Sequence, residues 1–453
     1  MIDTKITWVN HAGYVLSHKN INFLVDPWHS GTAFNNGWAL LADTYFPEQI
    51  AKSITHIWIS HEHPDHFSSQ NLIQLRKINK EKIKVFFQET KDKRVCNFLK
   101  KIGFDVHELK DYEEYKILND FKIQIVKSGQ IDSLSFFNVA DKLIVNTNDC
   151  DLSLDFLQSA KKKFNINKSD ILLAQFSYAY WIGKPNEKFK RELASKEKLE
   201  QIIQQVKILK PKITIPFASY IYYCHSENKY MNDSITSLTD VKTAIEKEKS
   251  EAVFLYPGSE YKLNEKYSDS AKNLEKYVSD FNSLSSKKYL NSPSVSLDDL
   301  KISSKKYLES LYKKNSKFVM YLFCLLSKLT KIFLKKDFFG FANIHIYITD
   351  LSTSINFDWI KGICISKKET ADVSISSDSL NYIFKYQWGI GSIMINGRGD
   401  YKNEYSKWLF NRMFVLGLIN SVEETLLLRT LKKITSNRLK LHEVEPSFLS
   451  KKK

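Results

Sequence analysis

The first 260 or so residues alternate short apolar runs with stretches of helical periodicity. Three apolar runs near the start, Ile6–Trp8, Tyr14–Leu16 and Ile21–Val25, are separated by turn residues and predict an antiparallel meander. The run Ile54–Ser60 predicts a further strand, and Ser68–Ile78 has the apolar spacing of a helix. Because strands and helices continue to alternate over residues 1–265, we expect an α/β first domain, a two-sheet sandwich with helices outside.

The pattern changes after residue 265. Residues 266–336 are rich in Lys, Ser and Asn, and their second half, Leu300–Lys336, has helical periodicity, so we interpret them as a linker followed by a helical segment. Residues 337–453 alternate again, which predicts a second, smaller α+β domain with a C-terminal helical tail. Its expected strands are Asn343–Thr349, Lys361–Ile365, Val373–Ile375 and Ser392–Asn396, and its expected helices are Asp378–Tyr386 and Tyr405–Leu418.

Composition and charge narrow the class of protein. The 453 residues are 43% hydrophobic, which excludes a disordered chain, and the formal net charge of +16 favours anionic partners. The five Cys residues form no CxxC pair, which argues against a disulfide framework and fits a reducing compartment. No secretory signal opens the chain, and its longest apolar run, Phe318–Leu326, is far shorter than the roughly 20 residues that span a bilayer. We therefore expect a cytoplasmic protein.

The strongest chemical signal is the segment SHEHPDHF at residues 60–67. It places His61, His63, Asp65 and His66 within six positions, at the end of an apolar strand and the start of a helix. Imidazole and carboxylate are ligands of zinc and non-haem iron, and residues i and i+2 of an extended segment point the same way, so His61 and His63 can share one metal ion. Asp65 and His66, after the turn at Pro64, can then face a second site. The alternative is a solvated loop that happens to be rich in His.

The HxHxDH arrangement resembles the metallo-β-lactamase superfamily, whose fold is an αββα sandwich. His11 in VNHAGYVL and Asp26 in FLVDPW stand where members of this superfamily have similar segments. The resemblance implies that Asp149, in VNTNDC, bridges two metal ions, that His225 is the last histidine ligand, and that Asp65 serves in catalysis as well as in ligation.

A narrower resemblance is carried by DPWHSGTAFNNGWAL at 26–40, NDC at 148–150 and PFASYIYYCHSENKY at 216–230. These stretches are similar to the catalytic part of the CMP-N-acetylneuraminate hydroxylase family, which implies iron chemistry on a nucleotide-activated sugar. His11, Trp28 and Trp181 are then expected to line the substrate cleft.

Two departures from these families are visible. Members of the superfamily supply another His before the bridging Asp, but residues 127–148 contain none, so we expect Gln130 or Asp132 to replace it. The Cys-x-His and Cys-x-x-His pairs that a Rieske cluster needs do not occur in the sequence, so an oxygenase reaction would require an external reductant.

The second domain gives weaker signals. DVSISSDSLNYIF at 372–384 and SIMINGRGDY at 392–401 resemble a sterol-carrier-protein-like domain. The basic stretch 313–336 interleaves Lys with apolar residues and either contacts a membrane surface or packs its apolar face on a domain. Nucleic acid is not an expected partner, because the positive charge is concentrated away from the His-rich motif.

The sequence therefore predicts a metalloenzyme that holds one or two ions, iron with zinc as the alternative. The favoured reaction is oxygenation of a small anionic substrate such as a nucleotide-activated acetamido sugar. The alternatives are a metal-dependent hydrolase of an amide, lactone or phosphodiester, and a binding module with a degenerate metal site.

Overall fold

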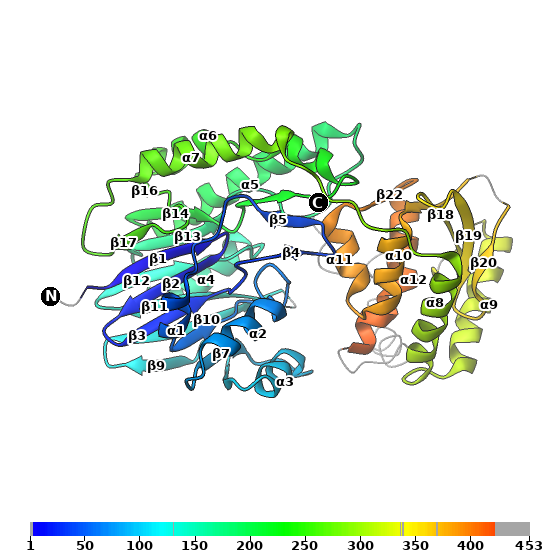
Figure 1. The fold of residues 1–453 in the computed structure, drawn as a ribbon, viewed down its shortest axis with the longest axis horizontal. Helices are drawn as coiled ribbons and strands as arrows, with labels where there is room; N and C mark the ends of the chain where they lie inside the picture. Colours follow the sequence, from blue (N-terminus) through cyan, green and yellow to red (C-terminus); the bar gives the residue numbers. More distant parts are fainter. Residues whose placement is uncertain (1–2, 130, 336, 338, 368–369, 422–453) are drawn as a thin grey trace. The chain divides into compact units, whose positions relative to one another are not determined.

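The computed structural model describes residues 3–421, apart from 130, 336, 338 and 368–369. The chain divides into two compact units (Figure 1). The first unit contains the chain up to Lys288 except for two short loops, 34–37 and 224–229. Both loops belong to the second unit, together with the chain from Tyr289 onward.

The first unit is built on two seven-stranded sheets. In order across the first sheet, the strands are β17 (Glu260–Lys262), β1 (Lys5–Asn10), β2 (Gly13–His18), β3 (Ile21–Val25), β6 (His56–Trp58), β7 (Lys84–Gln88) and β8 (Asp105–Leu109). The predicted antiparallel meander is confirmed, because β1 pairs with β2 and β2 with β3 in antiparallel register. The strands from β3 to β8 are parallel.

The second sheet combines antiparallel and parallel pairing. In order, its strands are β16 (Glu251–Ala252), β14 (Ile213–Phe217), β13 (Ile171–Gln175), β12 (Lys142–Asn146), β11 (Asp132–Val139), β10 (Phe121–Ser128) and β9 (Glu114–Leu118). A small third sheet joins β15 (Ile221–Tyr223), β5 (Trp38–Leu40) and β4 (Thr32–Ala33).

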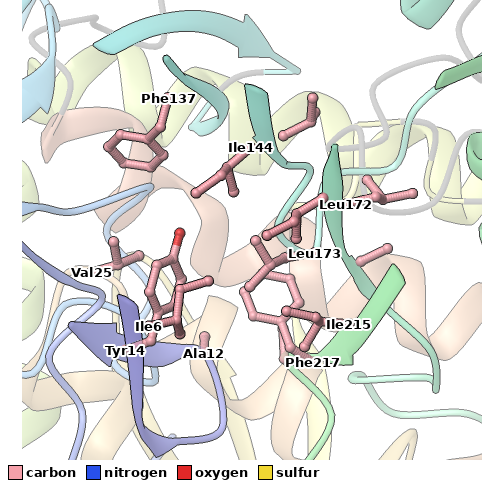
Figure 2. Close-up of a cluster of buried hydrophobic side chains, with 14 of the residues drawn as sticks. Ile6, Ala12, Tyr14, Val25, Phe137, Ile144, Leu172, Leu173, Ile215 and Phe217 are labelled. Carbon is pink, nitrogen blue, oxygen red and sulfur yellow. The ribbon is translucent and has the colours of Figure 1, made fainter. Parts of the chain in front are cut away.

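Side-chain alternation explains why the two large sheets face each other. On β6, Trp58 belongs to the core between the sheets, whereas its neighbour Ile57 belongs to the cluster formed with the outer helices. Across the interface, the rings of Phe23 and Phe137 meet edge to face with centroids 5.3 Å apart. Figure 2 shows part of this core.

Helices cover the outer faces of both sheets. On the first sheet they are α1 (Glu48–Ser53), α2 (Ser69–Ile78) and α3 (Arg94–Lys101), and on the second α4 (Leu154–Lys163), α5 (Lys188–Leu209) and α6 (Leu238–Lys247). Buried Leu72, Leu75 and Leu99 pack under the first set, and Leu157, Val206 and Val241 lie under the second. The predicted α/β sandwich with helices outside is confirmed.

The first unit extends beyond the predicted boundary at residue 265. Helix α7 (Ser270–Asn282) and the 3₁₀ turn Ser283–Ser286 belong to it, although we assigned both to the linker. The fully buried ring of Tyr277 stacks on Tyr220 with centroids 3.8 Å apart, and its hydroxyl donates to the carbonyl of Leu255 at 2.9 Å. One aromatic anchor thus holds a segment whose Ser, Lys and Asn content resembles that of a linker.

The second unit is α+β. Its five-stranded sheet runs β20 (Gly362–Ile365), β19 (Thr353–Asp358), β18 (Ile344–Ile348), β21 (Val373–Ile375) and β22 (Gly399–Tyr401). Its helices are α8 (Leu297–Tyr312), α9 (Lys317–Phe333), α10 (Ser377–Lys385), α11 (Gly389–Asn396) and α12 (Glu404–Ser421). The predicted C-terminal tail beyond residue 421 lies outside the described residues, and the sterol-carrier resemblance stays a prediction.

The strand predicted at Ser392–Asn396 is wrong, because these residues form the end of α11. A short apolar run does not by its periodicity distinguish a strand from a buried helical segment. Helix α11 packs closely on α10: a Cβ at Gly389 would lie only 2.7 Å from the Cα of Ile383, so glycine permits this approach. Gly397 ends the helix in the left-handed conformation, with φ of 72°.

Candidate metal centre

Several loops at one edge of the two sheets carry the predicted ligands. His11 lies in the turn between β1 and β2, residues 60–66 follow β6, Asp132 begins β11, and Asp149 follows β12. In each sheet the pairing directions bring these points to the same strand ends. His11 adopts a left-handed conformation, φ 45°, at its tight turn.

The first donor group combines two histidines and one carboxylate. One possible ligand atom from each of His61, His63 and Asp132 lies within 4.8 Å of the others. Nε2 of His61 is 2.9 Å from Nδ1 of His63 and 3.9 Å from Oδ1 of Asp132. Asp132 therefore lies where the sequence lacks the usual histidine, whereas Gln130, the other candidate, lies outside the described residues.

The second donor group has the same composition. His11, Asp65 and His66 are all buried, and again their ligand atoms lie within 4.8 Å of one another. Oδ2 of Asp65 is 3.5 Å from Nε2 of His11 and 3.1 Å from Nε2 of His66. This position supports a ligand role for Asp65, and its predicted catalytic role stays a prediction.

Asp149 connects the two groups. Its Oδ1 is 3.7 Å from Nε2 of His61, and its Oδ2 is 3.6 Å from Nε2 of His66. One carboxylate oxygen thus faces each group, which is the arrangement that a bridging ligand requires. The preceding residue, Asn148, has a φ of 54°, and its Oδ1 accepts a hydrogen bond from the backbone N–H of Asp149 at 3.1 Å.

Asp26, which is fully buried and belongs to neither donor group, orients the ligands. Oδ2 of Asp26 lies 2.9 Å from Nδ1 of His66, which fixes the ring so that its Nε2 points at Asp65 and Asp149. Asp26 also accepts hydrogen bonds from the backbone N–H and the hydroxyl of Ser60, at 2.8 and 2.9 Å. The Ser60 hydroxyl in turn lies 3.0 Å from Nδ1 of His61. The sequence showed Asp26 as part of a motif but gave no signal of this orienting role.

The electrostatics of the centre favour a bound cation. Burial lowers the pKa of His61 and His63, so both rings are neutral at pH 7 and in the form that binds metals. Burial, and then the charge of Asp149, raises the pKa of Asp132 to about 7. Burial opposes a charged His66, yet the surrounding carboxylates hold its pKa well above the usual value. A metal ion would replace the proton as the positive charge among these carboxylates.

Unpaired buried atoms show that the donor set fits metal ions. Both ring nitrogens of His11, Oδ1 of Asp65, Nε2 of His66 and Oδ1 of Asp149 are buried without a hydrogen-bond partner. Buried polar atoms are nearly always paired in native proteins, because an unpaired one costs about 1–3 kcal/mol. All of these atoms belong to the donor groups, and each residue could give one of them to a metal ion, so bound ions would satisfy most of them. His11, which we expected in the substrate cleft, lies in a group that could hold a metal ion.

The two cleft tryptophans have different surroundings. Trp28 is buried beside the second donor group, with its ring edge to face with His11 and centroids 5.4 Å apart. Trp181 is also buried, and its Nε1–H donates to the hydroxyl of Tyr230 at 2.9 Å. The structure therefore brings Trp28 beside the second donor group and gives Trp181 a hydrogen bond to Tyr230, and the cleft role of Trp181 stays a prediction.

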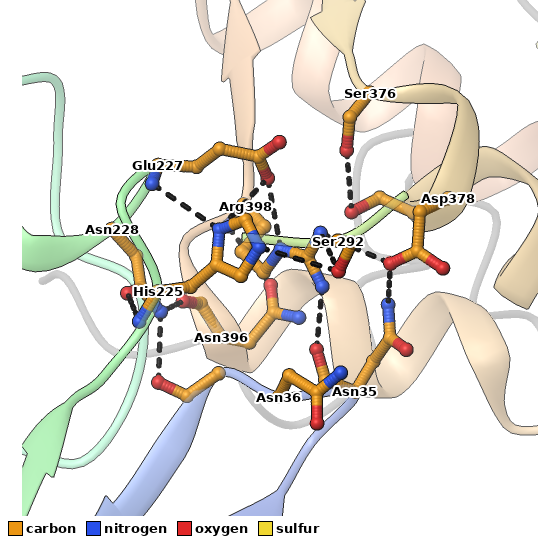
Figure 3. Close-up of polar contacts among 12 residues, drawn as sticks. Asn35, Asn36, His225, Glu227, Asn228, Ser292, Ser376, Asp378, Asn396 and Arg398 are labelled. Atoms are coloured by element: carbon orange, nitrogen blue, oxygen red, sulfur yellow. Dashed lines mark hydrogen bonds and ion pairs between the residues drawn. The ribbon is translucent and has the colours of Figure 1, made fainter. Parts of the chain in front are cut away.

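The structure does not place His225 in any donor group of the described residues. His225 lies on loop 224–229 of the second unit, where Nε2 is 3.3 Å from the hydroxyl of Ser292 and 3.7 Å separate Nδ1 from a carboxylate oxygen of Glu227 (Figure 3). This is not a nucleophilic triad. The backbone N–H of Glu227 donates to Nδ1, so the ring proton is on Nε2, which then donates to Ser292 rather than accepting its proton.

The surroundings of His225 are organised by a buried arginine. Arg398 donates to Oε2 of Glu227 at 2.8 Å, to Oδ2 of Asp378 at 3.0 Å and to the carbonyl of Asn35 at 2.6 Å. The Arg398 cluster, as we name it, consists of Asn35, His225, Glu227, Asn228, Ser292, Asp378, Asn396 and Arg398. It attaches the two short loops to the rest of the second unit, and no sequence pattern predicted it.

Comparisons with known proteins agree with the architecture of the first unit. Residues 5–135 match the family model described as "Beta-lactamase superfamily domain". This match and the two helix-covered sheets together show that the first unit has the metallo-β-lactamase fold.

Two curated proteins illustrate the narrower similarity. The chain is 25% identical over 250 residues to cytidine monophosphate-N-acetylneuraminic acid hydroxylase of Danio rerio, covering 51% of this chain and 40% of that protein. It is 26% identical over 246 residues to the Mus musculus enzyme of the same name, covering 52% and 42%. The chain thus matches less than half of the length of these hydroxylases. Among solved structures, it is similar to a possible metal-dependent hydrolase from Veillonella parvula, with a TM-score of 0.45 and 16% identity over 57% of this chain and 99% of that one.

Proposed function

We propose that the chain is a metal-dependent enzyme whose first unit holds two iron ions and hydroxylates a small anionic substrate. One observation carries this proposal. Two groups, each of two histidines and one carboxylate, stand side by side with Asp149 between them. Such a centre occupies one edge of a sandwich whose fold is shared with metal-dependent enzymes.

The donor set suits iron. Two histidines and one carboxylate are the ligands of non-haem Fe(II) oxygenases, where the remaining positions are open. Bound ferrous iron would supply the activation of O₂. The residues of the chain would hold the ions, and Asp26 would fix the ring of His66 so that its Nε2 faces the second ion. The similarity to curated hydroxylases supports the same reaction type.

The charge of the centre favours an anionic substrate. The four carboxylates of Asp26, Asp65, Asp132 and Asp149 balance two divalent cations. Burial lowers the pKa of Lys198, on α5, and nearby carboxylates, Asp149 and Asp132 among them, oppose this shift. A lysine near the centre would pair with an anionic substrate. The printed name of the similar hydroxylases points to a nucleotide-activated acetamido sugar as the first substrate to try.

Hydroxylation also consumes O₂, electrons and protons in a defined ratio. One O₂, two electrons and two protons convert a C–H group into C–OH and water. The proposal assigns the electrons to an external reductant, either a carrier protein or a chemical donor.

A metal-dependent hydrolase is the second candidate, and the donor set is also what favours it. Catalytic zinc sites use two histidines and a carboxylate with an open position for water. Zinc would supply a hydroxide at neutral pH, and the substrate would be an amide, lactone or phosphodiester.

The two candidates differ in their use of O₂. The full chain is loaded anaerobically with Fe(II) or with Zn(II), and then given a reductant and CMP-N-acetylneuraminic acid. We expect O₂ uptake that requires the sugar nucleotide, and a product one oxygen atom heavier by mass spectrometry, with iron alone. Both should be absent from the double variant His61→Ala/His63→Ala. Hydrolysis by the zinc-loaded protein without O₂, lost in His66→Ala, would favour the second candidate, and a protein that keeps neither metal would be a binding module.

A further inference from the structure

Helix α9 (Lys317–Phe333) in the second unit turns its large apolar side chains towards solvent. Phe318, Ile332 and Phe333 are 73%, 70% and 76% exposed. The exposed apolar face of α9, as we name it, consists of Phe318, Tyr321, Leu322, Leu325, Leu326, Leu329, Ile332 and Phe333. Their spacing of three and four residues places them along one stripe of the helix.

The opposite face of α9 explains why these side chains stay outside. Met320, Cys324 and Ser327 are the buried residues of the helix, and the hydroxyl of Ser327 accepts a hydrogen bond from the backbone N–H of Phe341 at 3.0 Å. A helix that stabilised the unit by its hydrophobic surface would bury its larger residues. An apolar stripe of this size on a soluble domain usually marks an interaction surface.

The charge around the stripe has one sign. Residues 313–336 contain seven Lys and no Asp or Glu. Lys331 donates to the side chain of Asn343 at 3.0 Å, and Lys328 lies 3.8 Å from a carboxylate oxygen of Asp358, so these two are positioned beside the helix. Lys317 and Lys335 are exposed near its two ends.

We propose that the exposed apolar face of α9 docks the chain onto an anionic phospholipid surface. The apolar side chains would enter the boundary between headgroups and acyl chains, and the flanking lysines would contact the anionic headgroups. The helix would lie in the plane of the surface. Its 17 residues are fewer than the roughly 20 that span a bilayer, and none of the helices in the described part of the chain is long and apolar enough to do so.

Charge argues against two other occupants of the exposed apolar face of α9, a second copy of the chain and its own residues 422–453. A second copy bound through the same face would bring the two lysine-rich segments against each other, because a twofold interface places the same patch on both partners. Residues 422–453 carry eight Lys and Arg against four Glu, a net +4, so they lack charge complementarity as well. Anionic lipid matches both the apolar stripe and its lysines.

Vesicle flotation with the full-length protein tests this proposal. One set of vesicles contains phosphatidylcholine alone, and the other contains roughly a third phosphatidylserine. We expect the protein to float with the anionic vesicles only, and to be released as the salt concentration is raised above about 0.1 M. The triple variant Phe318→Ser/Ile332→Ser/Phe333→Ser should bind at least about tenfold more weakly, a difference of about 1.4 kcal/mol.

A matched control distinguishes this face from general hydrophobicity. Phe189, in the first unit, is 64% exposed, and Phe189→Ser removes a similar side chain that is not part of α9, so this variant should float like the parent. The same circular dichroism spectrum for all variants confirms that they are folded. In a second measurement, a tryptophan placed by Phe333→Trp should be quenched by brominated lipid more strongly than one placed by Phe189→Trp.

Four outcomes would overturn the proposal. The first is a folded parent protein that binds neither kind of vesicle, and the second is equal binding to neutral and anionic vesicles. The third is a dimer in light scattering that the triple variant converts to a monomer, since the face would then bind a second copy. The fourth is lipid binding that appears only after residues 422–453 are removed, which would assign the face to that segment.

Discussion

The two units each contain a buried polar cluster, and the two clusters differ in how their atoms are satisfied. In the Arg398 cluster of the second unit, no buried side-chain nitrogen or oxygen is without a hydrogen-bond partner. In the candidate metal centre of the first unit, five buried nitrogen and oxygen atoms of His11, Asp65, His66 and Asp149 have none. Both clusters contain histidine and carboxylates, so residue type alone does not separate them.

This difference separates a structural network from a binding site. A buried network whose hydrogen bonds are complete already stabilises its unit, and a ligand would have to break those bonds. Donors buried without partners destabilise the protein until a ligand completes them. By the same comparison, we assign His225 to the structural network and His11 to the candidate metal centre.

The largest expected effect is on stability and follows metal loading. Metal bound at about 1,000 times its Kd should stabilise the first unit by about 4 kcal/mol, measured as a shift in denaturant unfolding with and without a chelator. The double variant His61→Ala/His63→Ala should show little of this shift. An equal shift in parent and variant would mean that the ions bind elsewhere.

Breaking the Arg398 cluster should lower the stability of the second unit without changing the metal content of the protein. Arg398→Met leaves Glu227 and Asp378 without their cation and should lower the stability of the second unit by about 3 kcal/mol. The metal content should not change, since none of the ligands is in this cluster. Elemental analysis and unfolding of the same preparation check both statements, and a loss of metal with unchanged stability would reverse our assignment of the two clusters.

The next prediction compares two histidines directly. His11→Ala should remove one ligand of the second group and leave about one metal ion per chain after desalting. His225→Ala should retain the metal content of the parent. If His225→Ala lost one ion and His11→Ala kept the metal content of the parent, His225 would be the ligand, as the superfamily resemblance implies.

A smaller effect is expected from the residue that orients His66. Asp26→Asn should weaken metal binding by about 10–100-fold, because such second-shell carboxylates fix the ring of the ligand and raise its basicity. Asp120 provides a matched control: it lies 3.1 Å from Nε2 of His18, outside the metal centre. Competition with a coloured chelator should give Asp120→Asn the affinity of the parent, and equal weakening in both variants would show a general effect on folding.

Much of the first unit was predictable from sequence, because its information is local. Alternation on strands such as Ile6–Trp8 fixes which face is buried, and HxHxDH places four chemically distinctive residues on one loop. The missing histidine before Asp149 also directed attention to Asp132. These inferences need only the spacing of nearby residues.

The rest depends on contacts between residues far apart in the sequence. The place of His11 is decided by the β1–β2 turn, and that of His225 by a hydrogen-bond network around Arg398, which no spacing reveals. Two stretches that carry the hydroxylase resemblance, 26–40 and 216–230, contain the loops 34–37 and 224–229 that pack in the second unit. Part of that resemblance therefore coincides with packing and not with metal ligation.

The central claim is that the unpaired buried donors of the first unit hold two metal ions. The most direct test is the metal content of the full-length protein after anaerobic reconstitution with Fe(II) and desalting, measured by elemental mass spectrometry. We predict close to two iron ions per chain in the parent protein. The triple variant His61→Ala/His63→Ala/His66→Ala should hold close to none. A folded parent protein that retains no metal of any kind would contradict the account.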